Sequence, residues 1–113
     1  MENCKVEKNA NYAVLFLSGR IDIIAAEDVE KQVNDIFTEG IANIIFDMKN
    51  VIYFSSSGVR LLISARNRTN ELDGKLALNN VNSTAEKIMN TLGIMEHYKI
   101  FNSLEKSIEY ISS

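Results

Sequence analysis

Three consecutive serines followed by a glycine, Ser55-Ser56-Ser57-Gly58, have the clearest capacity for chemistry in this sequence. They follow an apolar segment at residues 44–48 and a short connection, and they precede an amphipathic segment at residues 59–72. This pattern places them where a helix begins. A helix start offers free backbone N–H groups and the positive end of the helix dipole. A hydroxyl group there can cap the helix, act as a nucleophile or carry a phosphate.

A serine nucleophile requires partners that this sequence does not place nearby. The nucleophile elbow has the pattern Gly-x-Ser-x-Gly, whereas Phe54 stands two residues before Ser56. The one histidine, His97, is far along the chain and lies near an expected helix end. A small serine hydrolase therefore remains the alternative with the least support, and we expect no enzymatic activity.

Metal and nucleotide sites are also unsupported by the residue pattern. Cys4 is the one cysteine, and with the one histidine it makes no metal-ligand set. No Gly-Lys-Ser/Thr sequence is present to cradle a nucleotide phosphate. We therefore expect no metal and no cofactor.

The number of serines favours modification over simple capping. One serine suffices for an N-cap, which contributes about 1 kcal/mol. A phosphoserine carries a charge of roughly −1.5 to −2, and a helix start tolerates that charge. The fold would survive while the surface changed sharply. This combination predicts a switch in protein binding.

Length and composition predict one domain over residues 1–113, with apolar residues at 46% and charged residues at 24%. The net charge is −3 and the basic residues are scattered, so we expect no nucleic-acid binding. A single cysteine allows no internal disulfide, which is typical of a reducing compartment. The start of the chain has no signal-peptide pattern, and no apolar run reaches the roughly 18 residues of a membrane helix. We expect a cytoplasmic protein with no membrane insertion.

Strands alternate with helices along the chain. The apolar and β-branched runs predict strands at residues 4–8, 12–17, 44–48, 75–78 and 98–101. Helical spacing predicts helices whose apolar faces lie within residues 26–37, 59–72, 85–92 and 104–111. Gly40 is expected just after the first helix, a capping box at residues 83–86 starts the third, and Asn102 caps the last. The order predicts an α/β fold with a small, mostly parallel mixed sheet and an antiparallel N-terminal strand pair. It leaves open whether the four helices cover one face or both.

Several short motifs, in their order and spacing, resemble the STAS domain family, named for sulfate transporters and anti-sigma factor antagonists. They cover nearly the whole chain: Leu17-Ser18-Gly19-Arg20-Ile21-Asp22, then Ile45-Phe46-Asp47-Met48 with Ser55-Ser56-Ser57-Gly58-Val59, then Gly74-Lys75-Leu76-Ala77-Leu78 with residues 88–93. The chain looks most like the free-standing bacterial anti-sigma factor antagonists. The resemblance implies a single STAS-type domain.

The resemblance also implies a mechanism. In the family, the phosphorylated serine stands two residues before the glycine, which is Ser56 here. A partner that is both anti-sigma factor and serine kinase would phosphorylate it, and a PP2C-type phosphatase would reverse this. The unphosphorylated chain would bind the anti-sigma factor and so release a sigma factor for transcription. The best-studied members carry Asp before the acceptor and often a second glycine after it, whereas this chain has Ser55 and Arg60.

We predict a partner-binding surface made of Asp22, Ser55, Ser56, Ser57, Gly58 and Arg60. Within it, Ser57 is the expected helix cap and Gly58 allows close approach of a partner's backbone. Asp22 is expected near Ser56, either as a docking residue or as a turn or cap residue. The alternative function is an unphosphorylated STAS accessory module of a transport or signalling complex. The oligomeric state is left open.

Overall fold

The predicted α/β class is confirmed by a computed structural model that describes residues 3–113. Within that range the chain forms five strands, four α-helices and one short 3-10 helix. The strands are β1 (Cys4–Lys8), β2 (Ala13–Ile21), β3 (Ile44–Phe54), β4 (Leu76–Asn79) and β5 (Lys99–Phe101). The helices are α1 (Ile23–Thr38), α2 (Ser56–Glu71), α3 (Ser83–Thr91) and α4 (Leu104–Ser112), with the 3-10 helix η1 at Met95–His97.

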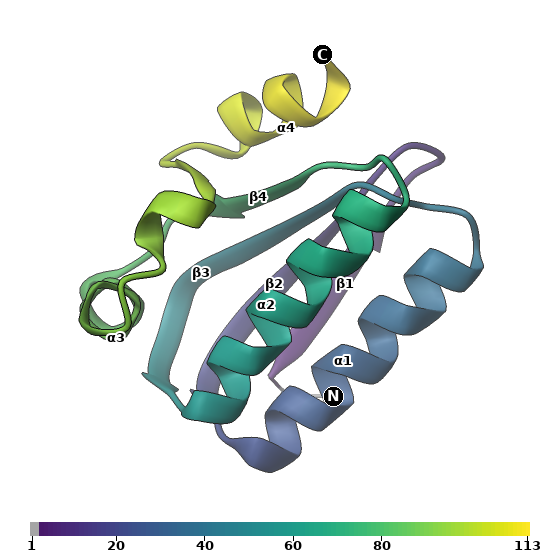
Figure 1. Cartoon of the computed structure of the whole chain (residues 1–113). Coiled ribbons are helices and arrows are strands. Elements are labelled where there is room, and N and C mark those ends of the chain that lie inside the picture. The colour runs from purple at the N-terminus through teal and green to yellow at the C-terminus, as the bar shows by residue number, and fades with distance from the viewer. Residues whose placement is uncertain (1–2) are drawn as a thin grey trace.

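The five strands form one mixed sheet in the order β1-β2-β3-β4-β5 (Figure 1). β1 pairs with β2 antiparallel, and every other neighbouring pair is parallel. This confirms the predicted N-terminal strand pair and the mostly parallel sheet. The carboxyl ends of β2 and β3 therefore meet, whereas β4 ends earlier, opposite Asp47. The carboxyl ends of parallel strands are where ligands of open α/β sheets bind.

β2 and β3 run further than their apolar patterns predict. The segment expected to be a connection after Met48 is the second half of β3, and it pairs with the extension of β2, with Gly19 opposite Val51 and Ile21 opposite Phe54. The polar residues at 49 and 50 interrupt the apolar run, which is why periodicity alone ends the strand too early. As a result, β2 and β3 end side by side.

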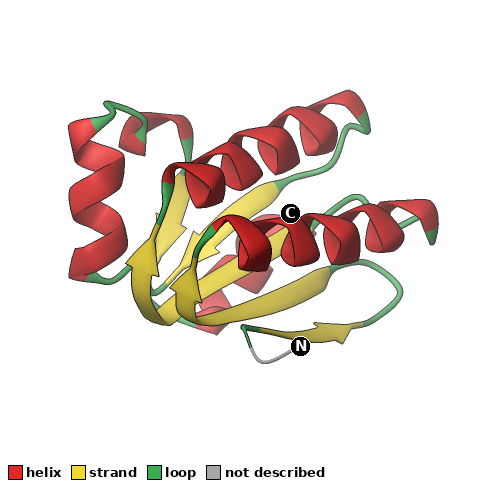
Figure 2. Cartoon of the chain, turned by 90° about the horizontal axis from the view of Figure 1, so that it is seen from below, coloured by secondary structure: helices red, strands yellow, loops and turns green. Residues whose placement is uncertain are grey.

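Helices cover both faces of the sheet, but unequally. Figures 1 and 2 show α1 and α2 next to each other over one face and α4 on the opposite side. Buried residues of α3 join the larger core on the face of α1 and α2. The smaller core beneath α4 contains Val14, Ile45, Ala77 and Ile111. Three helices thus pack on one face and one on the other, which settles the arrangement that periodicity left open.

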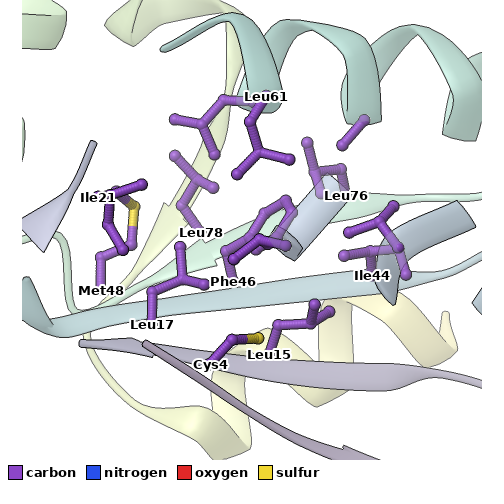
Figure 3. Packing of buried hydrophobic residues seen from close by; sticks show 14 of the residues in the cluster. Cys4, Leu15, Leu17, Ile21, Ile44, Phe46, Met48, Leu61, Leu76 and Leu78 are labelled. Carbon is purple, nitrogen blue, oxygen red and sulfur yellow. The ribbon is translucent and has the colours of Figure 1, made fainter. Parts of the chain in front are cut away.

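The larger core anchors the strands that carry the site. Leu15, Phe46 and Leu62 are fully buried within it, and burial of each such side chain stabilises the fold by roughly 1.5–3 kcal/mol. Figure 3 shows Cys4 of β1 packed against Leu15 in this core. Burial raises the pKa of the Cys4 thiol to about 11, and the carboxylate of Asp28 adds to the effect. The thiol is therefore a structural apolar group.

A buried polar network joins the sheet to α4. The Asp47 carboxylate accepts hydrogen bonds from the side-chain amides of Asn79 at 2.8 Å and Asn80 at 3.1 Å. The Asn79 side-chain oxygen in turn accepts from Ser107 Oγ of α4 at 3.1 Å. Each buried polar group is thus satisfied, which is what a buried carboxylate requires. The network fixes β3, β4 and α4 relative to one another.

The helix ends confirm one expected stop and correct two expected caps. Gly40 follows the end of α1 with φ +94, a conformation that favours glycine. The cap of α3 is Asn82 and not Ser83, because Asn82 Oδ1 accepts from Ala85 N while its amide donates to Val51 O of β3. The cap of α4 is Ser103 and not the preceding asparagine. In both places two capping residue types are adjacent, so local preference cannot choose between them.

Candidate functional site

The neighbouring ends of β2 and β3 place two helix starts side by side. Asp22 follows β2 and begins α1, and its Oδ1 accepts a hydrogen bond from Ala25 N at 3.0 Å. Ser55 follows β3 and begins α2 in the same way. The structure thus brings Asp22 close to the serine cluster and gives it the role of an N-cap. Its part in docking remains a prediction.

Ser55 joins the two helix starts. Its backbone N–H and its hydroxyl both donate to Ile21 O, at 3.0 Å and 2.8 Å. The same hydroxyl accepts from Gly58 N at 3.2 Å and so caps α2. The expectation that Ser57 is the cap was therefore wrong. Ser55 takes that role because its hydroxyl, held by Ile21 O where β3 ends, lies within reach of Gly58 N.

Ser56 is the first residue of α2, and its side chain is exposed. Its neighbour Ser57 is half-buried, and Ser57 Oγ accepts a hydrogen bond from Arg60 Nη2 at 3.2 Å. The Ser55 hydroxyl caps α2 and the Ser57 hydroxyl binds Arg60. Among the described residues, the Ser56 hydroxyl has neither of these roles. It is the best placed to be modified.

Gly58 has a clear structural reason to be glycine. A Cβ atom at this position would lie 3.0 Å from the Phe54 ring, closer than side chains normally pack. Phe54 is itself almost completely buried at the end of β3. Gly58 therefore lets α2 cross closely over β3, and the expected approach of a partner's backbone stays a prediction.

A groove with a volume of about 240 Å³ lies between α1 and α2 beside the serines. We call it the α1–α2 groove; it is lined by Ile23, Ala26, Glu27, Glu30, Ser57, Arg60 and Leu61. Its lining combines apolar side chains with two glutamates of α1 and one arginine of α2. A groove of this volume can accept a side chain of a partner protein.

Sequence reasoning missed a set of exposed apolar residues close in the chain to Asp22 and Ser56. Four large apolar side chains in this region are exposed, and we call them the apolar rim: Ile23, Ile24, Ile52 and Tyr53. The exposed fractions of Ile24 and Ile52 reach 72% and 68%. Each rim residue lies within four positions of Asp22 or Ser56 in the sequence, and the Arg20 guanidinium stacks over the Tyr53 ring at 4.4 Å. A partner protein that covers these exposed apolar side chains would remove them from water.

The hydrolase alternative finds no support in the geometry. Arg66 Nε donates to His97 O at 3.1 Å, which places His97 beside the second half of α2. Arg66 is ten residues after Ser56, about 15 Å along the helix axis. The histidine and the serine cluster are therefore at different ends of α2.

Residues 3–113 contain no group of three or more His, Cys, Asp or Glu side chains that could hold a metal ion. None of the helices in the same range is long and apolar enough to cross a bilayer. The apolar rim, the α1–α2 groove and Ser56 thus form the candidate site.

Comparison with known proteins agrees with this architecture. A family model described as the STAS domain matches residues 3–107. No curated protein sequence matches the chain. Among solved structures, the anti-sigma factor antagonist SpoIIAA in its unphosphorylated form has a TM-score of 0.85 at 22% identity, with 96% of each chain covered.

Two further solved structures show the same fold. The Bacillus cell fate determinant SpoIIAA in the phosphorylated form has a TM-score of 0.79 at 21% identity, with 96% of this chain and 98% of that chain covered. A putative anti-sigma factor antagonist from Thermotoga maritima has a TM-score of 0.89 at 16% identity, with 97% and 95% covered. At these identities the likeness establishes the fold and not the partners.

Proposed function

Because this chain belongs to the STAS domain family, we propose that it is an anti-sigma factor antagonist whose docking surface is switched by phosphorylation of Ser56. One observation carries the proposal: Ser56, the first residue of α2, is exposed, and four large apolar side chains within four positions of it or of Asp22 in the sequence are exposed as well. The structural likeness to antagonists, one of them in a phosphorylated form, supports the same conclusion.

The unphosphorylated surface has the composition of a docking site. The rim offers isoleucine and tyrosine side chains, which would become buried when a partner covers them. A standard interface covers about 800 Å² on each partner, enough to include the rim, Ser56 and the α1–α2 groove. In this form the chain would bind the anti-sigma factor and so free the sigma factor.

Phosphorylation would change this surface without disturbing the fold. Ser56 is exposed and is not one of the residues of the two hydrophobic cores. The phosphate would sit at the start of α2, where the helix dipole favours a negative charge. Covering a dianion with an apolar partner surface costs several kcal/mol, and each 1.4 kcal/mol weakens binding about tenfold. The partner complex would therefore dissociate.

The residue before the acceptor bears on recognition by the kinase. Ser55 replaces the aspartate of the best-studied members, and its hydroxyl is occupied by Ile21 O and Gly58 N. The kinase would thus meet no acidic group directly before Ser56. Recognition would depend on the apolar rim and on Arg60. The proposed partners are an anti-sigma factor that is also a serine kinase and a PP2C-type phosphatase.

The proposal is tested by incubating the chain with the anti-sigma factor kinase of its own organism and ATP, followed by intact mass measurement and peptide mapping. The expected result is a gain of about 80 Da located on Ser56, the mass of one phosphoryl group. Ser56→Ala should abolish the gain, and the matched variant Ser57→Ala should retain it. Phosphate on Ser57 alone, or none on either serine, would contradict the proposal.

A further inference from the structure

Arg60 is the feature of the site that the proposed switch does not yet explain. It follows Ser56 by four residues on α2 and is exposed. Among the described residues its guanidinium contacts one polar group, the Ser57 hydroxyl at 3.2 Å, and forms no ion pair. An arginine that donates to a neutral hydroxyl retains most of its capacity to bind an anion.

The other arginines of this region are already engaged. Arg20 stacks on Tyr53, and Arg66 donates to a backbone carbonyl of η1. Arg68 pairs with Glu71 at 3.8 Å and donates to Asn34. Arg60 is therefore the guanidinium group on α2 that can move to a new anion at the lowest cost in existing contacts.

We propose that Arg60 binds the phosphoryl group on Ser56 of its own chain and in doing so leaves the α1–α2 groove. This inference rests on the proposed phosphorylation of Ser56. Side chains four residues apart on a helix are neighbours, with Cβ atoms about 5–6 Å apart. The long arginine side chain spans the remaining distance to a phosphate, and its planar guanidinium group can donate two parallel hydrogen bonds to phosphate oxygens.

The movement of Arg60 would change the groove as well as the rim. Arg60 is the one cation among the described residues that line the groove, whereas Glu27 and Glu30 line its other wall. When Arg60 turns toward Ser56, the groove keeps two carboxylates and loses the opposing positive charge. Phosphorylation would thus alter two adjoining parts of the docking surface. A partner group that accepts hydrogen bonds from Arg60 in the unphosphorylated complex would lose its donor.

The test uses phosphoserine incorporated at position 56 by genetic code expansion, so that no kinase is required. The pKa of the second phosphate ionisation is followed by phosphorus NMR for the native background and for Arg60→Gln, Arg60→Lys and Arg68→Gln. A nearby guanidinium favours the dianion, so this pKa is expected to be lower with Arg60 than in Arg60→Gln by about 0.2 to 0.7. Arg60→Lys should restore at least half of the difference. Arg68→Gln removes a charge about two turns beyond Arg60 on the same helix and should leave the pKa unchanged.

One readout separates direct pairing from a general charge effect, and a second tests whether the difference in pKa is electrostatic. The side-chain N–H signal of Arg60 should shift when Ser56 carries the phosphate, while that of Arg68 stays in place. Raising the salt concentration to about 1 M should reduce the pKa difference, because the Debye length then falls to about 3 Å. An equal phosphate pKa with and without Arg60, or equal effects of Arg60→Gln and Arg68→Gln, would overturn the inference. These results do not depend on whether a kinase acts on Ser56, so they are distinguishable from failure of the proposed function.

Discussion

Replacing Ser55 with alanine removes two hydrogen bonds that share one hydroxyl group. Ser55 Oγ donates to Ile21 O at 2.8 Å and accepts from Gly58 N at 3.2 Å. Loss of an N-cap costs about 1 kcal/mol, and loss of a donor to the carbonyl of the buried Ile21 costs roughly 0.5–1.5 kcal/mol. Ile21 O keeps its hydrogen bond from the backbone N–H of Ser55 at 3.0 Å, so the lost hydroxyl donor should cost only about 0.5 kcal/mol.

We therefore expect Ser55→Ala to lower the free energy of unfolding by about 1.5 kcal/mol, which corresponds to roughly 5 °C in Tm for a domain of this size. Ser55→Asp should lose less, about 0.5 kcal/mol, because aspartate is an equally good cap but cannot donate to the carbonyl. The exposed Ser56 and the half-buried Ser57 are matched controls, and their alanine variants should stay within about 0.5 kcal/mol of the parent.

Urea unfolding at 25 °C, followed by circular dichroism, measures these differences. Equal m values across the series would show that the variants unfold from the same native state to the same denatured state. If Ser57→Ala costs more than Ser55→Ala, then α2 begins later than the structure shows. In that case the exposure of Ser56 and the link between the two helix starts would both be wrong.

Three further predictions concern the core, the β1 thiol and the apolar rim. Gly58→Ala should lower the free energy of unfolding by about 1–3 kcal/mol in the same urea assay, because the added methyl group would lie 3.0 Å from a buried ring; an unchanged midpoint would refute this packing. The Cys4 thiol has a pKa raised from 9.0 to about 11, so the unfolded chain binds fewer protons between these values. The contribution of the protonated thiol to the free energy of unfolding should therefore be complete below about pH 9 and should be lost as the pH rises toward 11. In Cys4→Ala, the free energy of unfolding should not show this fall with pH. The double variant Ile24→Ser and Ile52→Ser should weaken anti-sigma factor binding at least tenfold in calorimetry, by analogy with interface anchors, at unchanged Tm; unaltered affinity would remove the rim from the docking surface.

The strand and helix order could be predicted from sequence because each element carries its own apolar period. The second half of β3 could not, since Lys49 and Asn50 are polar and exposed, and only pairing with β2 makes them part of a strand. The start of α1 could not be predicted either, and the apolar stripe places it too late. Its first residues, Ile23 and Ile24, face solvent and so lie outside the buried helical stripe.

The serine cluster could be predicted as a helix start, but the division of work within it could not. Adjacent serines have the same intrinsic preference for the cap position, and the choice is made by a contact with Ile21, which lies 34 residues away in the sequence. The apolar rim has a similar origin. Isoleucine residues are expected in the core. Ile52 is nevertheless exposed, and it lies in the part of β3 beyond the pairing with β4, which no local sequence pattern reveals.

The central claim is that one phosphoryl group on Ser56 abolishes docking while the fold stays intact. The most direct measurement compares the chain carrying serine at 56 with the chain carrying encoded phosphoserine there, each titrated calorimetrically against the anti-sigma factor of the same organism. We predict a Kd in the micromolar range or tighter for the unmodified chain and a Kd at least 100-fold weaker for the phosphorylated chain, a difference of about 3 kcal/mol. Equal affinities for two chains with identical circular dichroism spectra would contradict the account.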